Sequence, residues 1–292
     1  MKNPADHYAS EEFRHGEIFR YLARYESVPE FRRILQTLGE HENEHLAFWL
    51  ERSDQKTFSV SRLELWRYRF LRKFLGLTFA AKYLERFQDD SSTTYGAILQ
   101  QTKDETLRAR LRTFIAAERA DEQTLIGQIK EERVAFISNI VLGLNDGLIE
   151  LTGALVGFSF ALQKPALVAL TGAITGISAA LSMASSAYLQ ARHDPDRMHE
   201  AKKSAVYTGL AYIMVVILLV TPFFFVSSTL VALAIMFCVV FTIIMCVSFY
   251  TAVLFSRRFR SQAGEMLIFS IGVAIIAFLI GTLFRIITGI EL

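Results

Sequence analysis

The sequence predicts an all-α protein in two parts, a soluble four-helix bundle followed by five membrane-spanning helices. Residues 1–133 hold 22 of the 31 Lys and Arg residues and 22 of the 29 Asp and Glu residues. The rest of the chain contains uncharged apolar runs long enough to cross a bilayer, which takes about 20 residues per helix. Few breakers interrupt the charged part, so helices are expected there too. We therefore expect domains at 1–132 and 133–292.

The charged part divides into four helices at its turn-forming residues. Val28-Pro29 separates the first two helices, Ser53 to Lys56 ends the second, and Asp89 to Thr93 separates the last two. Two helical hairpins of this kind pack most simply as a four-helix bundle. The expected helices span roughly 5–26, 29–52, 61–88 and 103–132.

The apolar part divides into five spans. Pro165 to Ala191 and Met266 to Phe284 are free of charge. So is Ser204 to Ser256, which is too long for one span and turns at Ser227-Ser228-Thr229. Recurring small residues in the first two spans favour close packing of helices. The expected spans are roughly 134–162, 165–191, 205–226, 229–256 and 265–288.

The distribution of basic residues orients these spans. Connections that alternate along the chain are rich in Lys and Arg, whereas the opposite connections hold only Lys164, with Arg285 near the last helix end. By the positive-inside rule the bundle and the N-terminus are cytosolic, and an odd number of spans puts the C-terminus on the far side. No apolar signal segment opens the sequence. We expect a multi-pass protein of the plasma or inner membrane, or of a vacuole-like compartment. The inward basic residues are Arg192, Arg197, Lys202, Lys203, Arg257, Arg258 and Arg260.

In the bundle, carboxylates recur at a spacing that suits a metal site. Glu42 and His45 are three residues apart and share one helical face. Glu12 precedes Glu42 by 30 residues, on the first helix of the same hairpin. Carboxylate and imidazole ligands suit iron or manganese. His15 extends the pattern as a chance match or an additional ligand. His41 completes a zinc-protease motif with Glu42 and His45, which we reject because no third ligand follows in a suitable setting.

The second hairpin repeats the carboxylate spacing. Glu85 precedes Glu118 by 33 residues, as Glu12 precedes Glu42 by 30. Dinuclear carboxylate bundles take a Glu from each of two helices and a Glu-x-x-His from each of the other two. Here Asp121 stands where the second histidine is expected, so this half of the site has oxygen ligands alone.

Two carboxylates lie in the first apolar span. Asp146 is near its middle, where an unpaired charge costs at least ~2.5 kcal/mol, and Glu150 follows one turn later on the same face. One interpretation is a pair of acids facing a polar bundle interior. The other is a cation or proton site on a transport pathway, which is the usual role of an intramembrane acid. Met183 in the second span is either a thioether ligand or core filler.

The apolar part resembles the vacuolar iron transporter family. The matching strings are LGLNDGL at Leu142 to Leu148 and AALSMASSAY at Ala179 to Tyr188. The resemblance implies a dimeric, proton-coupled exporter of cytosolic ferrous iron, or of manganese, with Asp146 and Met183 at the transport site. Two features depart from the family. The metal-binding segment between the second and third spans is reduced to a short connection. A glutamate after the Ser-Met-Ala string is also missing, and Glu150 is the candidate replacement.

The bundle resembles the rubrerythrin branch of the ferritin-like superfamily. Together the two resemblances indicate the membrane-bound ferritin type, in which a ferritin-like domain is fused to a transporter-like domain. The resemblance implies a di-iron centre with ligands Glu12, Glu42, His45, Glu85 and Glu118, and with Asp121 in place of a histidine.

One segment has no role in either resemblance. Leu63 to Leu77 reads LELWRYRFLRKFLGL and mixes aromatic residues with Arg and Lys. It is either a helix lying on the cytosolic membrane surface or a surface helix that leads into the Glu85 helix.

The leading hypothesis is export of ferrous iron or manganese in exchange for protons, by a homodimer whose bundle captures the metal. A membrane-anchored ferroxidase or peroxide-reducing di-iron protein is the second hypothesis, and a metal sensor that gates the transporter is the third. The formal net charge of +2 gives no reason to expect nucleic acid as a partner.

Overall fold

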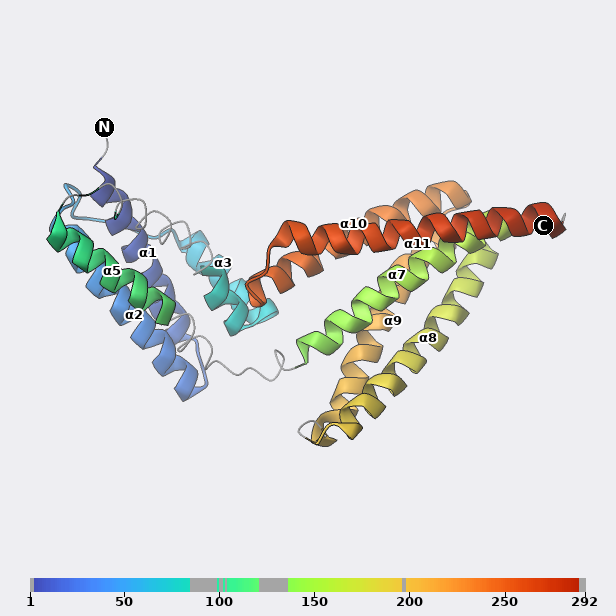
Figure 1. Ribbon diagram of the computed structural model, residues 1–292, viewed down its shortest axis with the longest axis horizontal. Helices are drawn as coiled ribbons and strands as arrows, with labels where there is room; N and C mark the ends of the chain where they lie inside the picture. The colour runs from blue at the N-terminus through green and yellow to red at the C-terminus, as the bar shows by residue number, and fades with distance from the viewer. Residues whose placement is uncertain are drawn as a thin grey trace. The chain divides into compact units, whose positions relative to one another are not determined.

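The computed structural model describes residues 3–84, 99, 102, 104–120, 136–195 and 198–288, and the regular structure found in these residues is helical (Figure 1). The expected all-α class is confirmed. The chain forms two compact units, which are described one at a time. Unit 1 comprises Met1–Glu131 and Val253–Ser256, and unit 2 comprises Glu132–Ala252 and Arg257–Leu292.

Side-chain caps and prolines start the helices of unit 1. The Asn3 side chain accepts a hydrogen bond from the Ala5 amide, and Ser61 does the same for Leu63. Pro29 occupies a first-turn position, where its missing N–H costs nothing. The helices are α1 (Pro4–Arg24), α2 (Pro29–Leu50), α3 (Arg62–Leu75) and α5 (Glu105–Ala120).

Gly76 interrupts the third predicted helix. The sequence predicts one helix over 61–88, but α3 ends at Leu75 and a second helical stretch runs from 77 to 84, the last residue described there. Gly76 has a φ of 103°, which only glycine adopts without strain. Its amide still bonds to the Arg72 carbonyl, so the interruption changes the direction of the chain and leaves the last turn of α3 intact.

Two apolar clusters hold the helices of unit 1 together. One joins α1 and α2 to α3 and to the 77–84 stretch, with Phe19, Leu35 and Tyr68 buried in it. The other joins α1 and α2 to α5 through Trp49 and Phe114. The α1–α2 pair therefore packs against the α3 and 77–84 segment through one cluster and against α5 through the other. This arrangement is consistent with the expected four-helix bundle.

The described residues of unit 2 form five helices long and apolar enough to cross a membrane, as the sequence predicts. The mean hydropathy of their most apolar windows runs from 1.4 in the first helix to 3.1 in the fourth, and the two acids depress the first value. A short 3-10 turn, η3 (Met198–Glu200), precedes the third helix. The five are α7 (Ile137–Leu162), α8 (Pro165–His193), α9 (Ala201–Phe225), α10 (Thr229–Leu254) and α11 (Phe259–Thr288).

Helix α7 lies at the centre of the packing in unit 2, because it contacts α8, α9 and α11 (Figure 1). Leu148 and Leu155 of α7 and Tyr212 of α9 are completely buried in the shared core. Large apolar side chains point outward instead, such as Phe225 at 83 % exposure and Ile287 at 74 %. An apolar exterior around a packed interior is the arrangement that a lipid environment requires.

Small residues set the spacing of these helices. A Cβ atom on Gly143 would lie 2.4 Å from the Thr208 carbonyl oxygen of α9, and one on Gly281 would lie 2.5 Å from the Gly157 carbonyl oxygen. Neither position has room for a side chain. The glycine-rich stripes that the sequence shows are therefore used for packing within this chain, α7 against α9 and α7 against α11.

Candidate metal centre

Three buried ligand side chains converge between α1 and α2. Glu12 comes from α1, and Glu42 and His45 lie one turn apart on α2; all three are less than 10 % exposed. Each offers a ligand atom that lies within 4.8 Å of the other two. His45 Nδ1 is 3.7 Å from Glu12 Oε2. The structure thus brings together the three residues that the spacing of the first hairpin predicts.

Close contact between α1 and α2 positions this cluster. A Cβ atom on Gly16 would meet the Glu42 Cβ at 3.4 Å, so the two helices touch one turn beyond Glu12. The ring of Phe114 from α5 covers His45, with ring centroids 4.2 Å apart. The carboxylates and the imidazole therefore lie in an apolar enclosure that limits access of water.

His15 is buried beside this cluster but is not one of the three grouped ligands. Its Nε2 accepts a hydrogen bond from the Arg14 guanidinium at 3.0 Å. Burial lowers the pKa of His15 to about 3, while the Glu12 carboxylate opposes the shift and Arg14 adds to it. His15 is therefore neutral, and its Nε2 is occupied by the Arg14 guanidinium.

The second half of the predicted di-iron site lies outside the described residues. Glu85 and Asp121 are not described, and Glu118 belongs to α5 without a described side chain. Among the residues described, the Glu12, Glu42 and His45 group is the one that meets the geometry for a metal. His41 is not one of the three members of this group.

The chemistry of the cluster fits a divalent transition metal. Two carboxylates supply oxygen ligands and one imidazole supplies nitrogen, a combination that suits iron, manganese or zinc. The two buried carboxylates repel each other, and burying negative charge without a counter-ion costs free energy. A bound cation would remove this cost and stabilise the cluster. The cluster is therefore a candidate metal centre, and its ligands do not select one of these metals.

A second cluster of acids lies within unit 2. Asp146 and Glu150 are one turn apart on α7 and close enough for their charges to interact. The buried Tyr212 of α9 donates a hydrogen bond to Glu150 Oε2 at 2.7 Å. Sequence reasoning missed Tyr212, because a tyrosine in an apolar span gives no signal by itself. Helix packing supplies the partner.

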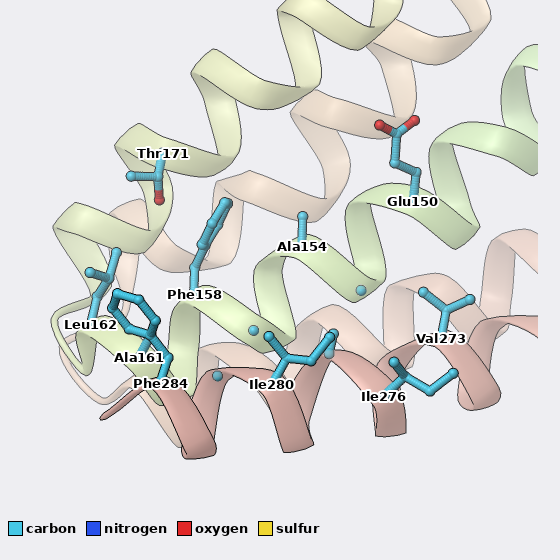
Figure 2. A pocket seen from close by; sticks show the side chains of 14 residues that line it. Glu150, Ala154, Phe158, Ala161, Leu162, Thr171, Val273, Ile276, Ile280 and Phe284 are labelled. Carbon is cyan, nitrogen blue, oxygen red and sulfur yellow. The ribbon is translucent and has the colours of Figure 1, made fainter. Parts of the chain in front are cut away.

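Glu150 also borders a cavity of about 630 Å³ between α7 and α11 (Figure 2). Ala154, Phe158 and Leu162 continue from Glu150 along α7, and Val273 and Ile280 face them from α11. Apart from Glu150 and Thr171, the lining side chains are apolar. The carboxylate thus lies at the boundary between this apolar space and the polar contact with Tyr212.

Met183 makes packing contacts with apolar side chains. Its side chain is half-buried on α8 and packs against the apolar core of unit 2. No hydrogen bond among the described side chains joins it to Asp146 or Glu150. In the α8–α9 connection, His193, Met198 and His199 are exposed, as expected of solvated loop residues.

Among the comparisons with known proteins, the one with family models gives a match. Searches of curated proteins and of solved structures yield no match. Residues 137–203, which cover α7, α8 and the start of α9, match the model of the VIT family. That segment includes both intramembrane acids and Met183. The match and the five apolar helices support a VIT-type membrane domain in unit 2.

Proposed function

We propose that this protein exports ferrous iron or manganese from the cytosol in exchange for protons. Unit 1, a rubrerythrin-like di-iron domain, captures or senses the metal on the cytosolic side. Unit 2 moves it across the membrane, with Asp146 as the principal transport residue and Glu150 and Met183 as auxiliaries. By its resemblance to the VIT family the transporter acts as a homodimer.

One observation carries the proposal: the segment that matches the VIT family holds two acids on one face of a membrane-capable helix. A membrane anchor needs no carboxylates, and each costs free energy on insertion. Carboxylates bind either protons or divalent cations, so a shared site allows one to displace the other. The buried ligand cluster of unit 1 gives independent support for a metal as cargo.

The bundle has a separate role in this proposal. Glu12, Glu42 and His45 converge from α1 and α2, and Glu85, Glu118 and Asp121 are proposed to complete a dinuclear centre. With Asp121 in place of a histidine, the second half of the centre has oxygen ligands only. Such a ligand set favours delivery or sensing of the metal over repeated oxidation. Loss of the bundle site should then slow or deregulate transport without abolishing it.

The test is flux through the full-length protein in liposomes. Fe²⁺ or Mn²⁺ entry is followed with an internal metal-quenched dye, and proton movement with an internal pH dye. Asp146→Asn should abolish both signals, whereas Glu42→Gln should leave transport at a reduced rate. Glu265→Gln is the matched control, since Glu265 is an exposed acid at the start of α11. Wild-type flux in Asp146→Asn would refute the assigned transport site.

The buried ligand cluster also favours a second function, a membrane-anchored ferroxidase or peroxide-reducing enzyme. Oxygen or peroxide consumption on adding Fe²⁺ would then be rapid, would be lost in Glu42→Gln and would be unaffected by Asp146→Asn. If unit 1 instead gates unit 2 as a sensor, Glu42→Gln should change the metal concentration at which transport begins and leave the maximal rate unchanged.

A further inference from the structure

Helix α3 carries an exposed surface that combines apolar and basic side chains and has no role in the proposed function. Its exposed positions hold four apolar residues and four cations, and no acid. The apolar residues are Leu63, Trp66, Phe70 and Phe74, with exposures of 74, 59, 45 and 59 %. The cations are Arg62, Arg67, Arg69 and Lys73.

Helical spacing arranges these residues into one stripe with charged borders. The apolar residues follow one another at intervals of three, four and four, which places them on a single face. The rings of Phe70 and Phe74 lie 4.3 Å apart, and those of Trp66 and Phe70 lie 5.8 Å apart. By the same spacing, Arg67 borders the stripe on one side, and Arg69 and Lys73 border it on the other. We call this surface the α3 face.

The remaining charges of α3 turn inward and fix the orientation of the helix. Glu64 accepts a hydrogen bond from Arg14 of α1 at 2.9 Å, and Arg72 donates to the buried Glu26 at 2.9 Å. Tyr68 is buried between them at 1 % exposure. These contacts leave α3 no freedom to rotate its apolar stripe into the core, so its exposure is built into unit 1.

We propose that the α3 face binds the surface of a bilayer that contains anionic phospholipids. A helix with aromatic residues on one side and Arg and Lys along its borders is suited to the headgroup region, where rings enter the interface and cations meet lipid phosphates. A protein partner for an apolar stripe would not require cations on both borders. The absence of acids on the exposed half of α3 matches a negatively charged surface.

Unit 1 is covalently connected to the membrane-capable helices of unit 2. Residues 121–136 connect α5 of unit 1 to α7, the first membrane-capable helix. Because unit 1 is covalently joined to a membrane-capable helix, the α3 face meets a bilayer surface at an effective lipid concentration in the millimolar range or above, so even a weak surface affinity is sufficient. Docking would fix the orientation of unit 1 toward the membrane that unit 2 spans.

Trp66 makes the proposal directly measurable, because the chain has two tryptophans and the other, Trp49, is only 4 % exposed. Full-length protein carrying Trp49→Phe is placed in nanodiscs of phosphatidylcholine and phosphatidylglycerol whose acyl chains are brominated near the headgroup. Docking predicts that Trp66 emission shifts to the blue and that bromine quenches most of it. The Trp66→Phe protein, which retains Trp49, should show no quenching.

Charge variants test the anionic lipid. Arg67→Gln with Arg69→Gln should weaken docking roughly fivefold for each cation removed, which lowers quenching, and so should high salt or omission of phosphatidylglycerol. The matched control is Arg110→Gln with Arg112→Gln, which removes two exposed cations from α5. Unchanged helical circular dichroism and an unchanged thermal midpoint verify that each variant is folded.

Three outcomes would overturn the proposal. Emission of Trp66 that is neither shifted nor quenched would show that the α3 face stays in water. A blue-shifted emission without bromine quenching would show that protein covers the face, either a second copy or a partner. Quenching that is equal in anionic and neutral discs would also contradict recognition of anionic lipid.

Discussion

At the scale of single residues, the most specific prediction concerns Glu42. Glu42→Gln keeps the shape of the side chain but removes one charge of the candidate metal centre, so metal should no longer stabilise unit 1. For the unchanged protein, Mn²⁺ at about 100 times its dissociation constant should add about 2.7 kcal/mol of stability. Differential scanning fluorimetry with and without Mn²⁺ measures the effect. Glu44→Gln, an exposed neighbour on α2, should retain the full shift.

Tyr212 provides a second prediction at this scale. Tyr212→Phe removes the hydroxyl that donates to Glu150 and leaves the ring in the core. A hydrogen-bond donor favours the ionised carboxylate, which is the form that binds a cation, so without the hydroxyl protons compete better with the metal and the metal concentration for half-maximal flux should rise. Tyr207→Phe, on the same helix, should transport normally. An unchanged half-maximal concentration in Tyr212→Phe would remove Glu150 from the transport site.

Individual residues also show how far sequence reasoning reaches. Glu12, Glu42 and His45 were predictable as a group, because helical periodicity relates Glu42 to His45 and the hairpin repeat relates both to Glu12. Tyr212 was not predictable, since its partner lies 62 positions away and no local pattern links them. His15 has the same Glu-x-x-His spacing, but spacing alone did not predict that its Nε2 would accept a hydrogen bond from Arg14.

At the scale of helices, the close contact of α7 and α9 makes a stability prediction. Gly143→Ala would place a methyl group 2.4 Å from the Thr208 carbonyl, so the helices must separate. Overpacking of this kind costs about 1–3 kcal/mol, and the thermal midpoint of unit 2 should fall. Gly264→Ala is the control, because nothing lies within 4 Å of its added carbon. Its midpoint should stay or rise, since alanine favours helix over glycine.

The attachment of α3 makes a prediction that depends on pH. Burial raises the pKa of Glu26, but the Val28 amide and Arg72 outweigh burial and hold the pKa below its usual value. The ionised carboxylate therefore stabilises the fold above the ordinary glutamate pKa, and this stability is lost as pH falls through the lower, folded-state pKa.

Glu26→Gln should accordingly lower the free energy of unfolding of unit 1 by about 2 kcal/mol at neutral pH. The difference from the unchanged protein should shrink as the solution is made acidic. Urea unfolding of the full-length protein carrying Trp66→Phe, in detergent and followed by Trp49 fluorescence at several pH values, measures it. Glu30→Gln, an exposed acid in the first turn of α2, should behave like the unchanged protein at every pH.

The helices themselves were largely predictable. Four of the five spans follow from uncharged runs of sufficient length, and the first follows from an apolar run interrupted only by Asp146 and Glu150. The ends of α1 and α2 follow from prolines and caps. The interruption at Gly76 was not predictable, because a single glycine within a helical pattern is often tolerated. Its positive φ is imposed by the packing on either side, with Tyr68 and Leu84 held in one cluster.

At the scale of the whole molecule, the basic connections predict the orientation in the membrane. Lys164→Cys between α7 and α8, in a chain with Cys238→Ser and Cys246→Ser, should react with an impermeant maleimide added outside intact cells. His193→Cys at the end of α8 should react only after the cells are permeabilised. The reverse pattern would place unit 1 outside and would contradict an exporter that collects its cargo from the cytosol.

The two-residue connection after α7 has a consequence for biosynthesis. Gln163, in a left-handed conformation, and Lys164 are all that separate Leu162 from Pro165. A helix that carries Asp146 and Glu150 is a poor substrate for insertion alone. Such a short turn commits α8 to follow immediately and to lie against α7, so the two enter the bilayer as a hairpin. The acidic helix then meets the lipid already partnered by an uncharged one.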